Sequence, residues 1–357
     1  MAVLGKLLLR VPLLLAAVAL APSAAPLSDM PTADELRWRL PTVPFPTGNE
    51  PTPLRVQLGE RLFFDVRLSR SGTMSCATCH DPEKGWADGL PTARGFAGKV
   101  LPRSTPTIIN AAYAGILMWD GRAASLEDQA LGPINSLDEM GANSDEVAEN
   151  SEKALRYLNA DASYRLAFAR AYPGELIDRT TLAKAIASFE RTVLSDQSPF
   201  DRWLAGDREA MTSQQIRGFR VFTNPQKGGC AACHQAPHFI DDGFHNIGLA
   251  SYGKASHDMG RYAIKPVAVN KGAFKTPGLR NVAATAPYFH DGSAASLAEV
   301  VEHYVSGGRV QTNLSQDIKP IVLTPQDKED LLAFLNALTD ERTALQSSRR
   351  EVHSAIK

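Results

Sequence analysis

The 357-residue sequence has little cysteine and almost no excess of charge of either sign. All four cysteines fall in two short motifs, so none is left over for a disulfide. The 38 basic and 39 acidic side chains give a net charge of −1 at pH 7. A chain without a positive field has no electrostatic means of attracting nucleic acid, and it carries no acidic tail. The composition therefore excludes a disulfide-built scaffold and a nucleic-acid partner.

Little of the sequence alternates with the two-residue period of a β-strand. A proline-rich stretch from Pro41 to Pro53 predicts an extended lead-in. Apolar residues elsewhere recur at helical spacing, and Thr324 followed by Pro325 has the pattern of a helix start. The segments with this periodicity are 56–64, 144–172, 180–194, 216–222 and 325–338. We therefore expect a mostly α fold.

What the sequence does contain is the motif Cys-x-x-Cys-His, twice. The copies are Cys76-Ala-Thr-Cys79-His80 and Cys230-Ala-Ala-Cys233-His234. Two thiols at this spacing add to the two vinyl groups of one porphyrin, and the histidine that follows ligates the iron. Zinc sites and thioredoxin-like redox pairs also use Cys-x-x-Cys, but they give the two histidines no role. The sequence predicts two covalently bound haem c groups.

The first 25 residues have the pattern of a secretory signal peptide. Basic residues precede an apolar run from Val11 to Ala21, and small residues follow it. The run is too short for a comfortable membrane span. Pro22 and Pro26 crowd the expected cleavage site, so an uncleaved anchor is the alternative. We expect the protein to be exported, which agrees with the attachment of haem c after translocation. The mature protein is then expected to be periplasmic and to have no membrane span after cleavage.

The two motifs belong to a longer internal repeat. Thr105–Glu127 matches Thr276–Ala298 without a gap and shares an identical Ala-Ala-Ser-Leu segment. The chain is therefore predicted to contain two cytochrome c-like haem domains. The expected organisation is a signal peptide (1–25), an extended segment (26–53), an N-terminal haem c domain (54–200), a C-terminal haem c domain (201–345) and a tail (346–357).

Two differences between the copies bear on the chemistry of the haems. Trp119 in the first copy faces His290 in the second, and Pro133 in the first faces Tyr304 in the second. A tyrosine near a haem iron can ligate it, whereas a proline cannot. If this position overhangs the iron, the second haem is closed and the first is open. Only an open iron can meet a peroxide.

The order of these motifs resembles the bacterial di-haem cytochrome c peroxidase and MauG superfamily over residues 54–340. In that family the N-terminal haem is peroxidatic, the C-terminal haem transfers electrons, and a tryptophan lies between them. The motifs that carry the resemblance are Cys76-Ala-Thr-Cys-His80, Trp119-Asp-Gly-Arg122, Cys230-Ala-Ala-Cys-His234, Phe244-His-Asn-Ile-Gly248, Phe274-Lys-Thr-Pro277 and Thr285-Ala-Pro-Tyr-Phe-His-Asp-Gly292.

The resemblance also implies catalytic residues. Trp119 takes the place of the inter-haem tryptophan, and Gln129 and Glu139 lie at the family's spacing from it. The implied roles are electron relay for Trp119 and assistance in cleaving the oxygen–oxygen bond of peroxide for Gln129 and Glu139, with Glu139 transferring a proton. Without that spacing, Trp119 would be interpreted as a core aromatic and Glu139 as a solvated carboxylate.

Departures from the family pattern favour one branch. No histidine lies between His80 and His234, so the histidine that closes the peroxidatic haem of ordinary peroxidases is missing. Tyr304 stands where those peroxidases carry a methionine ligand, and no methionine follows Met259. Tyrosine there is the mark of MauG, which oxidises residues of a separate protein through a high-valent state shared by both haems. His303 and Met259 are the alternatives as sixth ligand.

A structural calcium ion between the domains is a further implication of the resemblance. Its ligands would be the backbone carbonyls of Thr285 and Pro287, with Ser104 in place of the family's asparagine. A neutral serine oxygen is a poorer ligand for a hard cation, which weakens the site.

The function implied is that of a MauG-type oxidoreductase that uses hydrogen peroxide to oxidise a partner protein. The alternative is a peroxidase that reduces hydrogen peroxide with electrons from a small cytochrome c or cupredoxin. A third reading, a simple electron carrier, is disfavoured by Pro133, because a carrier has no use for an open iron.

Overall fold

The computed structural model describes residues 30–141 and 149–343. The predicted signal peptide and the predicted tail lie outside these ranges. None of the helices within them combines the length and apolar character needed to cross a membrane. The described chain is mostly helical, which confirms the predicted fold class.

The α-helices are α1 Pro53–Phe63, α2 Cys76–Cys79, α3 Leu126–Asn135, α4 Glu149–Ala160, α5 Ala162–Ala171, α6 Arg179–Glu190, α7 Pro199–Leu204, α8 Ser213–Thr223, α9 Leu297–Val305 and α10 Pro325–Ala337. Short 3₁₀ helices lie at Glu35–Trp38, Val66–Leu68, Pro82–Lys84, Phe96–Gly98, Ala111–Tyr113, Cys230–Ala232, Arg261–Ala263, Ala268–Asn270 and Val282–Ala284. Strand β1 (Phe244–His245) pairs antiparallel with β2 (Phe274–Lys275), so that Phe244 faces Lys275.

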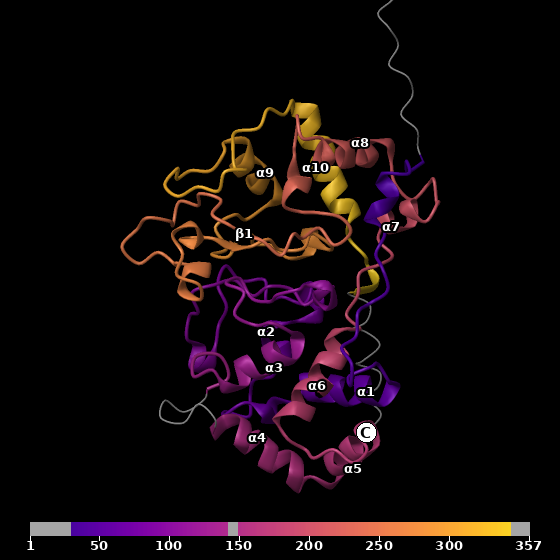
Figure 1. Ribbon diagram of the computed structural model, residues 1–357, viewed down its shortest axis with the longest axis vertical. Coiled ribbons are helices and arrows are strands. Elements are labelled where there is room, and N and C mark those ends of the chain that lie inside the picture. Colours follow the sequence, from indigo (N-terminus) through magenta and orange to yellow (C-terminus); the bar gives the residue numbers. More distant parts are fainter. Residues whose placement is uncertain (1–29, 142–148, 344–357) are drawn as a thin grey trace, which may run out of the picture.

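Two lobes are stacked along the long axis of the molecule. Helices α1 to α6 form the N-terminal lobe, and α7 to α10 with the small sheet form the C-terminal lobe (Figure 1). Each lobe has its own hydrophobic core, the first including Phe63 and Phe189 and the second Phe219 and Phe334. The cores agree with a division of the chain near residue 200, although the domain boundaries given above stay predictions.

A crossing of two helices with a glycine at the contact forms the centre of each lobe. Helix α1 packs on α6, and α8 packs on α10. A Cβ atom added at Gly59 would overlap the carbonyl oxygen of Ala185, and one added at Gly218 would overlap that of Asp330. Glycine therefore lets the two backbones of each pair approach closely. In each lobe the crossing thus packs the helix that precedes the haem motif (α1 or α8) on the last helix of that lobe (α6 or α10).

The internal repeat is visible in the backbone. Helices α3 and α9 begin at matched positions, with Ser125 and Ser296 as N-caps whose hydroxyls accept hydrogen bonds from the backbone N–H groups three residues on. Asn110 and its counterpart Asn281 both adopt left-handed conformations, with φ of 57° and 59°. The repeat seen in the sequence is thus a repeat of structure.

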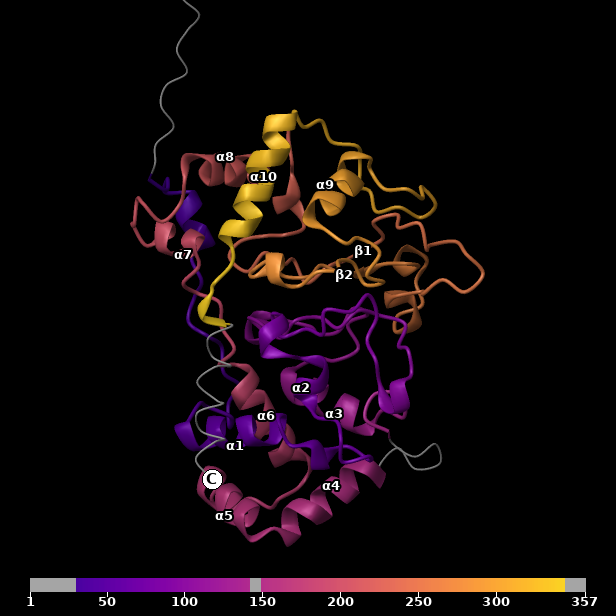
Figure 2. The same cartoon turned by 180° about the vertical axis from the view of Figure 1, so that it is seen from behind.

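Among the hydrogen bonds that join the lobes, one is made twice. The N–H of Ser104 donates to the carbonyl of His290 at 2.7 Å, and the N–H of Lys275 donates to the carbonyl of Trp119 at 2.8 Å. Ser104 matches Lys275 in the repeat, and Trp119 matches His290. We call these two bonds the reciprocal pair. Lys275 belongs to β2, which lies at the edge of the C-terminal lobe that faces the N-terminal lobe in Figure 2.

The stretch from Pro41 to the start of α1 at Pro53 has no helix or strand, whereas a short helix precedes it. Glu35–Trp38 forms a 3₁₀ helix, and Trp38 is 1% exposed in the core of the C-terminal lobe. Its indole packs against Phe219, Phe222 and Phe239. Burial of so large an aromatic surface fixes this part of the segment. The segment then continues to the N-terminal lobe, where Asn49 is buried, so it spans both lobes.

Candidate haem-binding active site

A cavity of about 390 Å³ extends between the lobes. His80 contributes to its wall from the N-terminal lobe, and Cys230, Cys233 and His234 contribute from the C-terminal lobe. Many of the other wall residues are apolar, and both copies of the repeat contribute to them, for example Ile108 and Leu279. One cavity thus contains the predicted proximal histidines of both haems.

The geometry of the two histidines fits axial ligation of a haem iron. His80 Nδ1 lies 3.2 Å from the carbonyl of Trp86, and His234 Nδ1 lies 3.0 Å from that of Phe239. A carbonyl only accepts, so each Nδ1 carries the proton and each Nε2 keeps its lone pair. Burial lowers the pKa of both imidazoles, which favours the neutral form. A neutral imidazole held through Nδ1–H is the form that ligates iron.

The four cysteines also fit haem attachment. None is in a disulfide. In each motif the N–H of the histidine donates to the carbonyl of the first cysteine at 2.9 Å, from His80 to Cys76 and from His234 to Cys230. This single helical turn, α2 in the first motif, carries Cys79 back toward the side of Cys76. The residues present can hold two haem groups through thioether bonds.

The walls formed by α3 and α9 differ between the lobes. Leu126 and its counterpart Leu297 both line the cavity, but Gln129 lines it where the second copy has Val300. One turn later, Tyr304 lines the cavity, and its counterpart Pro133 is not among the wall residues. The part of the wall formed by α3, in the lobe of the first haem motif, therefore carries an amide. The part formed by α9, in the lobe of the second, carries a phenol. The gap-free match between the two copies ends at Glu127, and the Gln129–Val300 difference beyond it was not among those noted from the sequence.

Tyr304 is placed better than either of its rivals as a ligand. It lines the cavity together with His234, and burial raises the pKa of its phenol. His303 instead donates its Nε2–H to the carbonyl of Ile247 at 2.8 Å. Neither His303 nor Met259 is among the wall residues. The role of Tyr304 as sixth ligand stays a prediction.

Trp119 lies where the lobes meet. Its indole N–H donates to the carbonyl of Ser104 at 2.9 Å, and its ring lies 6.4 Å from that of His290. The His290 ring stacks on Phe274 at 3.5 Å. Burial lowers the pKa of His290 to about 4, so this ring is neutral at pH 7. Three neutral rings thus form an aromatic row across the lobe boundary.

Comparison with known proteins agrees with this site. The family model for di-haem cytochrome c peroxidase matches residues 53–209. The methylamine utilization protein MauG of Methylorubrum extorquens is 45% identical over 313 residues, which cover 87% of this chain and 85% of that protein. The chain belongs to the di-haem cytochrome c peroxidase and MauG family. The predicted resemblance is confirmed.

Members of both branches of this family are similar to the chain. The cytochrome c551 peroxidase of Pseudomonas aeruginosa is 35% identical over 294 residues, 81% of this chain and 80% of that protein. A solved structure of a MauG-like protein associated with microbial copper homeostasis has a TM-score of 0.77 and 36% identity, and the match covers 86% of this chain and 96% of that one. The chain is therefore a haem-dependent oxidoreductase with the di-haem fold of this family.

The glutamate at the family's position lies outside the cavity wall. Glu139 Oε1 is 3.6 Å from Arg122 Nη2, and Glu139 is not among the wall residues, whereas Gln129 is. Burial raises the pKa of Glu139, and Arg122 partly offsets that rise. The pKa of Cys79 is raised by burial first and then by carboxylates that include Glu139. Glu139 thus lies near the first haem motif, behind the wall.

The three residues of the predicted calcium site all line the cavity. Ser104 is buried, and its carbonyl accepts the Trp119 indole N–H. The hydroxyl of Thr285 donates to the carbonyl of Val282 at 3.1 Å. Pro287 follows nearby in the same wall. Calcium binding by Ser104, Thr285 and Pro287 stays a prediction.

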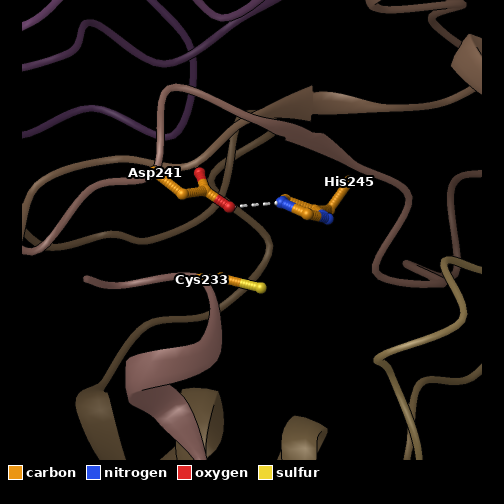
Figure 3. Close-up of side chains that lie close together, drawn as sticks. All are labelled: Cys233, Asp241 and His245. Atoms are coloured by element: carbon orange, nitrogen blue, oxygen red, sulfur yellow. Dashed lines mark hydrogen bonds and ion pairs between the residues drawn. The ribbon is translucent and has the colours of Figure 1, made fainter.

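One further cluster of metal-ligand types lies within the described ranges. Atoms of Cys233, Asp241 and His245 that could bind a metal lie within 4.8 Å of one another. His245 Nε2 and Asp241 Oδ2 are 2.8 Å apart, with the Cys233 sulfur below them in Figure 3. Because Cys233 belongs to the second haem motif, its sulfur is the one that a thioether bond uses. The cluster is part of the second haem site and not a separate metal centre.

Proposed function

We propose that this chain is a periplasmic MauG-type enzyme with two covalently bound haem c groups, which uses hydrogen peroxide to oxidise residues of a partner protein. One observation carries this choice within the family. Tyr304 lines the cavity beside His234, and its counterpart Pro133 offers the first haem no ligand. The signal-peptide pattern of residues 1–25 supports the location.

When bound, the two haem groups supply the reaction with peroxide and the one-electron steps. His80 and His234 would hold the irons through Nε2, and Tyr304 would close the second iron. Gln129 is the polar group on the wall beside the first haem and orients the peroxide by hydrogen bonding. Glu139 transfers the proton, and burial raises the pKa of its carboxyl above the usual value, which favours the protonated form that can donate.

Oxidation of the partner takes place at a distance from the first haem. The aromatic row of Trp119, His290 and Phe274 supports electron transfer across the lobe boundary, because these rings follow one another between the two haem sites. Electrons from the partner enter on the side of the C-terminal lobe, and Trp119 passes them toward the first haem.

The second candidate function is a peroxidase that takes electrons from a small cytochrome c or cupredoxin. The similarity to the Pseudomonas aeruginosa peroxidase favours it. The two candidates differ in what the diferric protein does when peroxide is the only reagent. A MauG-type enzyme loses two electrons spread over both haems, and an ordinary peroxidase needs one haem reduced beforehand.

Replacing Tyr304 with methionine tests this proposal. A phenolate stabilises ferric iron more than a thioether does, so Tyr304→Met should raise the potential of the second haem. The variant should then no longer give the two-haem oxidised state when peroxide is added to the diferric protein. The measurement combines a potentiometric titration with optical spectra after peroxide addition.

His303→Ala is the matched control on the neighbouring residue and should leave the low-spin spectrum unchanged. If His303→Ala changes that spectrum, or if Tyr304→Met still forms the two-haem oxidised state, Tyr304 is not the ligand and the MauG-type proposal fails.

A further inference from the structure

A carboxyl group that makes no ion pair with the described residues is buried in the N-terminal lobe. Glu190 is the last residue of α6 and is 3% exposed. Its Oε2 atom makes no hydrogen bond with any residue that the structure describes. A buried ionised carboxylate without a partner is costly, so such a group either pairs or stays protonated.

The neighbouring arginine does not neutralise Glu190. Arg191 donates to both oxygens of Glu127 on α3, at 2.7 and 2.8 Å. Asn49 donates a further hydrogen bond to the same carboxylate at 2.9 Å. Glu190 also lies at the C-terminal end of its helix, where the helix dipole disfavours negative charge. Its pKa is raised to about 8, first by burial, so it is mainly protonated at pH 7.

Glu190 lies close to the first haem attachment. The pKa of the Cys76 thiol is raised by burial first and next by the charge of Glu190. In the mature protein this sulfur is a thioether and does not titrate, which leaves Arg191 and Glu127 as the charged groups that act on Glu190. The residues of α1 that contact α6 include Gly59 and Phe63, and neither is charged.

The second lobe has no such group. The helix crossings align α6 with α10, because Gly59 lies against Phe189 as Gly218 lies against Phe334. Glu190 therefore corresponds to Leu335, which lines the cavity in the C-terminal lobe. An acid thus occupies, in the first lobe, the helix position that leucine occupies in the second, although Glu190 itself is not among the wall residues of the cavity.

We propose that Glu190 is a proton-exchanging residue coupled to the haem held by His80. Its carboxyl releases one proton to solvent when this haem loses one electron to an outside acceptor, such as a redox mediator or peroxide. It takes one proton back when the electron returns. The proton and the electron leave together, so the net charge of this buried region does not change. The inference rests on a haem at His80 and not on the oxidation of a partner protein.

The test is the pH dependence of each haem's midpoint potential, measured by potentiometric titration with electron paramagnetic resonance to separate the haems. Oxidised iron lowers the proton affinity of the carboxyl, so protons favour the reduced form. Near neutral pH, each rise of one pH unit should therefore lower the midpoint potential of the first haem and shift its redox equilibrium tenfold toward the oxidised form. That shift is about 59 mV for one electron.

Two variants separate this role from a structural one. Glu190→Gln keeps the size and removes the titrating proton, and Glu190→Leu installs the residue of the second lobe. Both should abolish the pH dependence of the first potential near neutral pH and leave that of the second haem unchanged. Glu175→Gln is the control. Glu175 is exposed, precedes α6 in the chain and pairs with Lys184 of α6.

A second readout observes the proton directly. Oxidation of the wild type should remove the C=O band of a protonated carboxyl from the infrared difference spectrum, and Glu190→Gln should lack this change. If the pH dependence or the band survives in either variant, the proposal is wrong. Neither measurement uses a partner protein, so the result does not depend on the function proposed above.

Discussion

Replacing Gly59 with alanine should destabilise the N-terminal lobe, even though alanine is the better helix former. The added Cβ would lie 2.8 Å from the carbonyl carbon of Ala185 and 2.9 Å from the Cβ of Phe189. Backbone atoms cannot rotate away, so α1 and α6 must separate. Overpacking of this kind costs about 3 kcal/mol at the upper end of its usual range. The helix preference of alanine offsets about 1 kcal/mol, which leaves a net loss of about 2 kcal/mol.

This loss corresponds to a fall in melting temperature of about 4–8 °C for a lobe of this size. The assay is thermal unfolding of the haem-loaded protein followed by circular dichroism. Gln57→Ala is the control, because Gln57 is exposed on the same helix and its replacement should change stability by less than about 0.5 kcal/mol. A Gly59→Ala protein as stable as the wild type would refute the reasoning, since the two helices would then not be in close backbone contact.

Two other results are expected from the site. Glu139→Gln should slow the reaction with peroxide by about 100- to 10,000-fold in stopped-flow measurements while both haems stay bound, and a loss well below tenfold would reduce Glu139 to a structural residue. The diferric protein should show one high-spin and one low-spin haem by electron paramagnetic resonance, because no histidine lies between His80 and His234 and Pro133 cannot ligate iron. Two low-spin haems would contradict an open first iron.

The sequence predicted the features that rest on local spacing. The two Cys-x-x-Cys-His motifs and the repeat depend on residues close together in the chain, and the structure shows matched caps at Ser125 and Ser296. The helix start at Thr324–Pro325 is likewise local, and α10 begins there. Local chemistry of this kind is readable because neighbouring residues alone determine it.

The features that the sequence did not reveal depend on packing between distant segments. Trp38 precedes the proline-rich stretch, and its burial depends on the aromatic cluster around Phe219, far away in the chain. In the sequence, Glu190 lies at the end of a helical pattern and resembles a solvated helix-end carboxylate. In the structure, α6 crosses α1 and Glu190 is buried in the interior. The ion pair of Glu139 with Arg122 joins residues from two separate segments, and spacing along the chain does not indicate it.

The reciprocal pair of hydrogen bonds between the lobes has the form of an isologous interface, in which the same patch serves both partners. A homodimer with such an interface must carry identical side chains on its two halves, so any change suited to one active site is imposed on the other. Here the contact joins main-chain atoms of Ser104 to His290 and of Lys275 to Trp119, and main-chain bonds tolerate any side chain. Because both halves belong to one chain, the symmetric contact is kept while the side chains at these positions differ. A two-fold scaffold can in this way hold two unlike redox centres at a fixed separation.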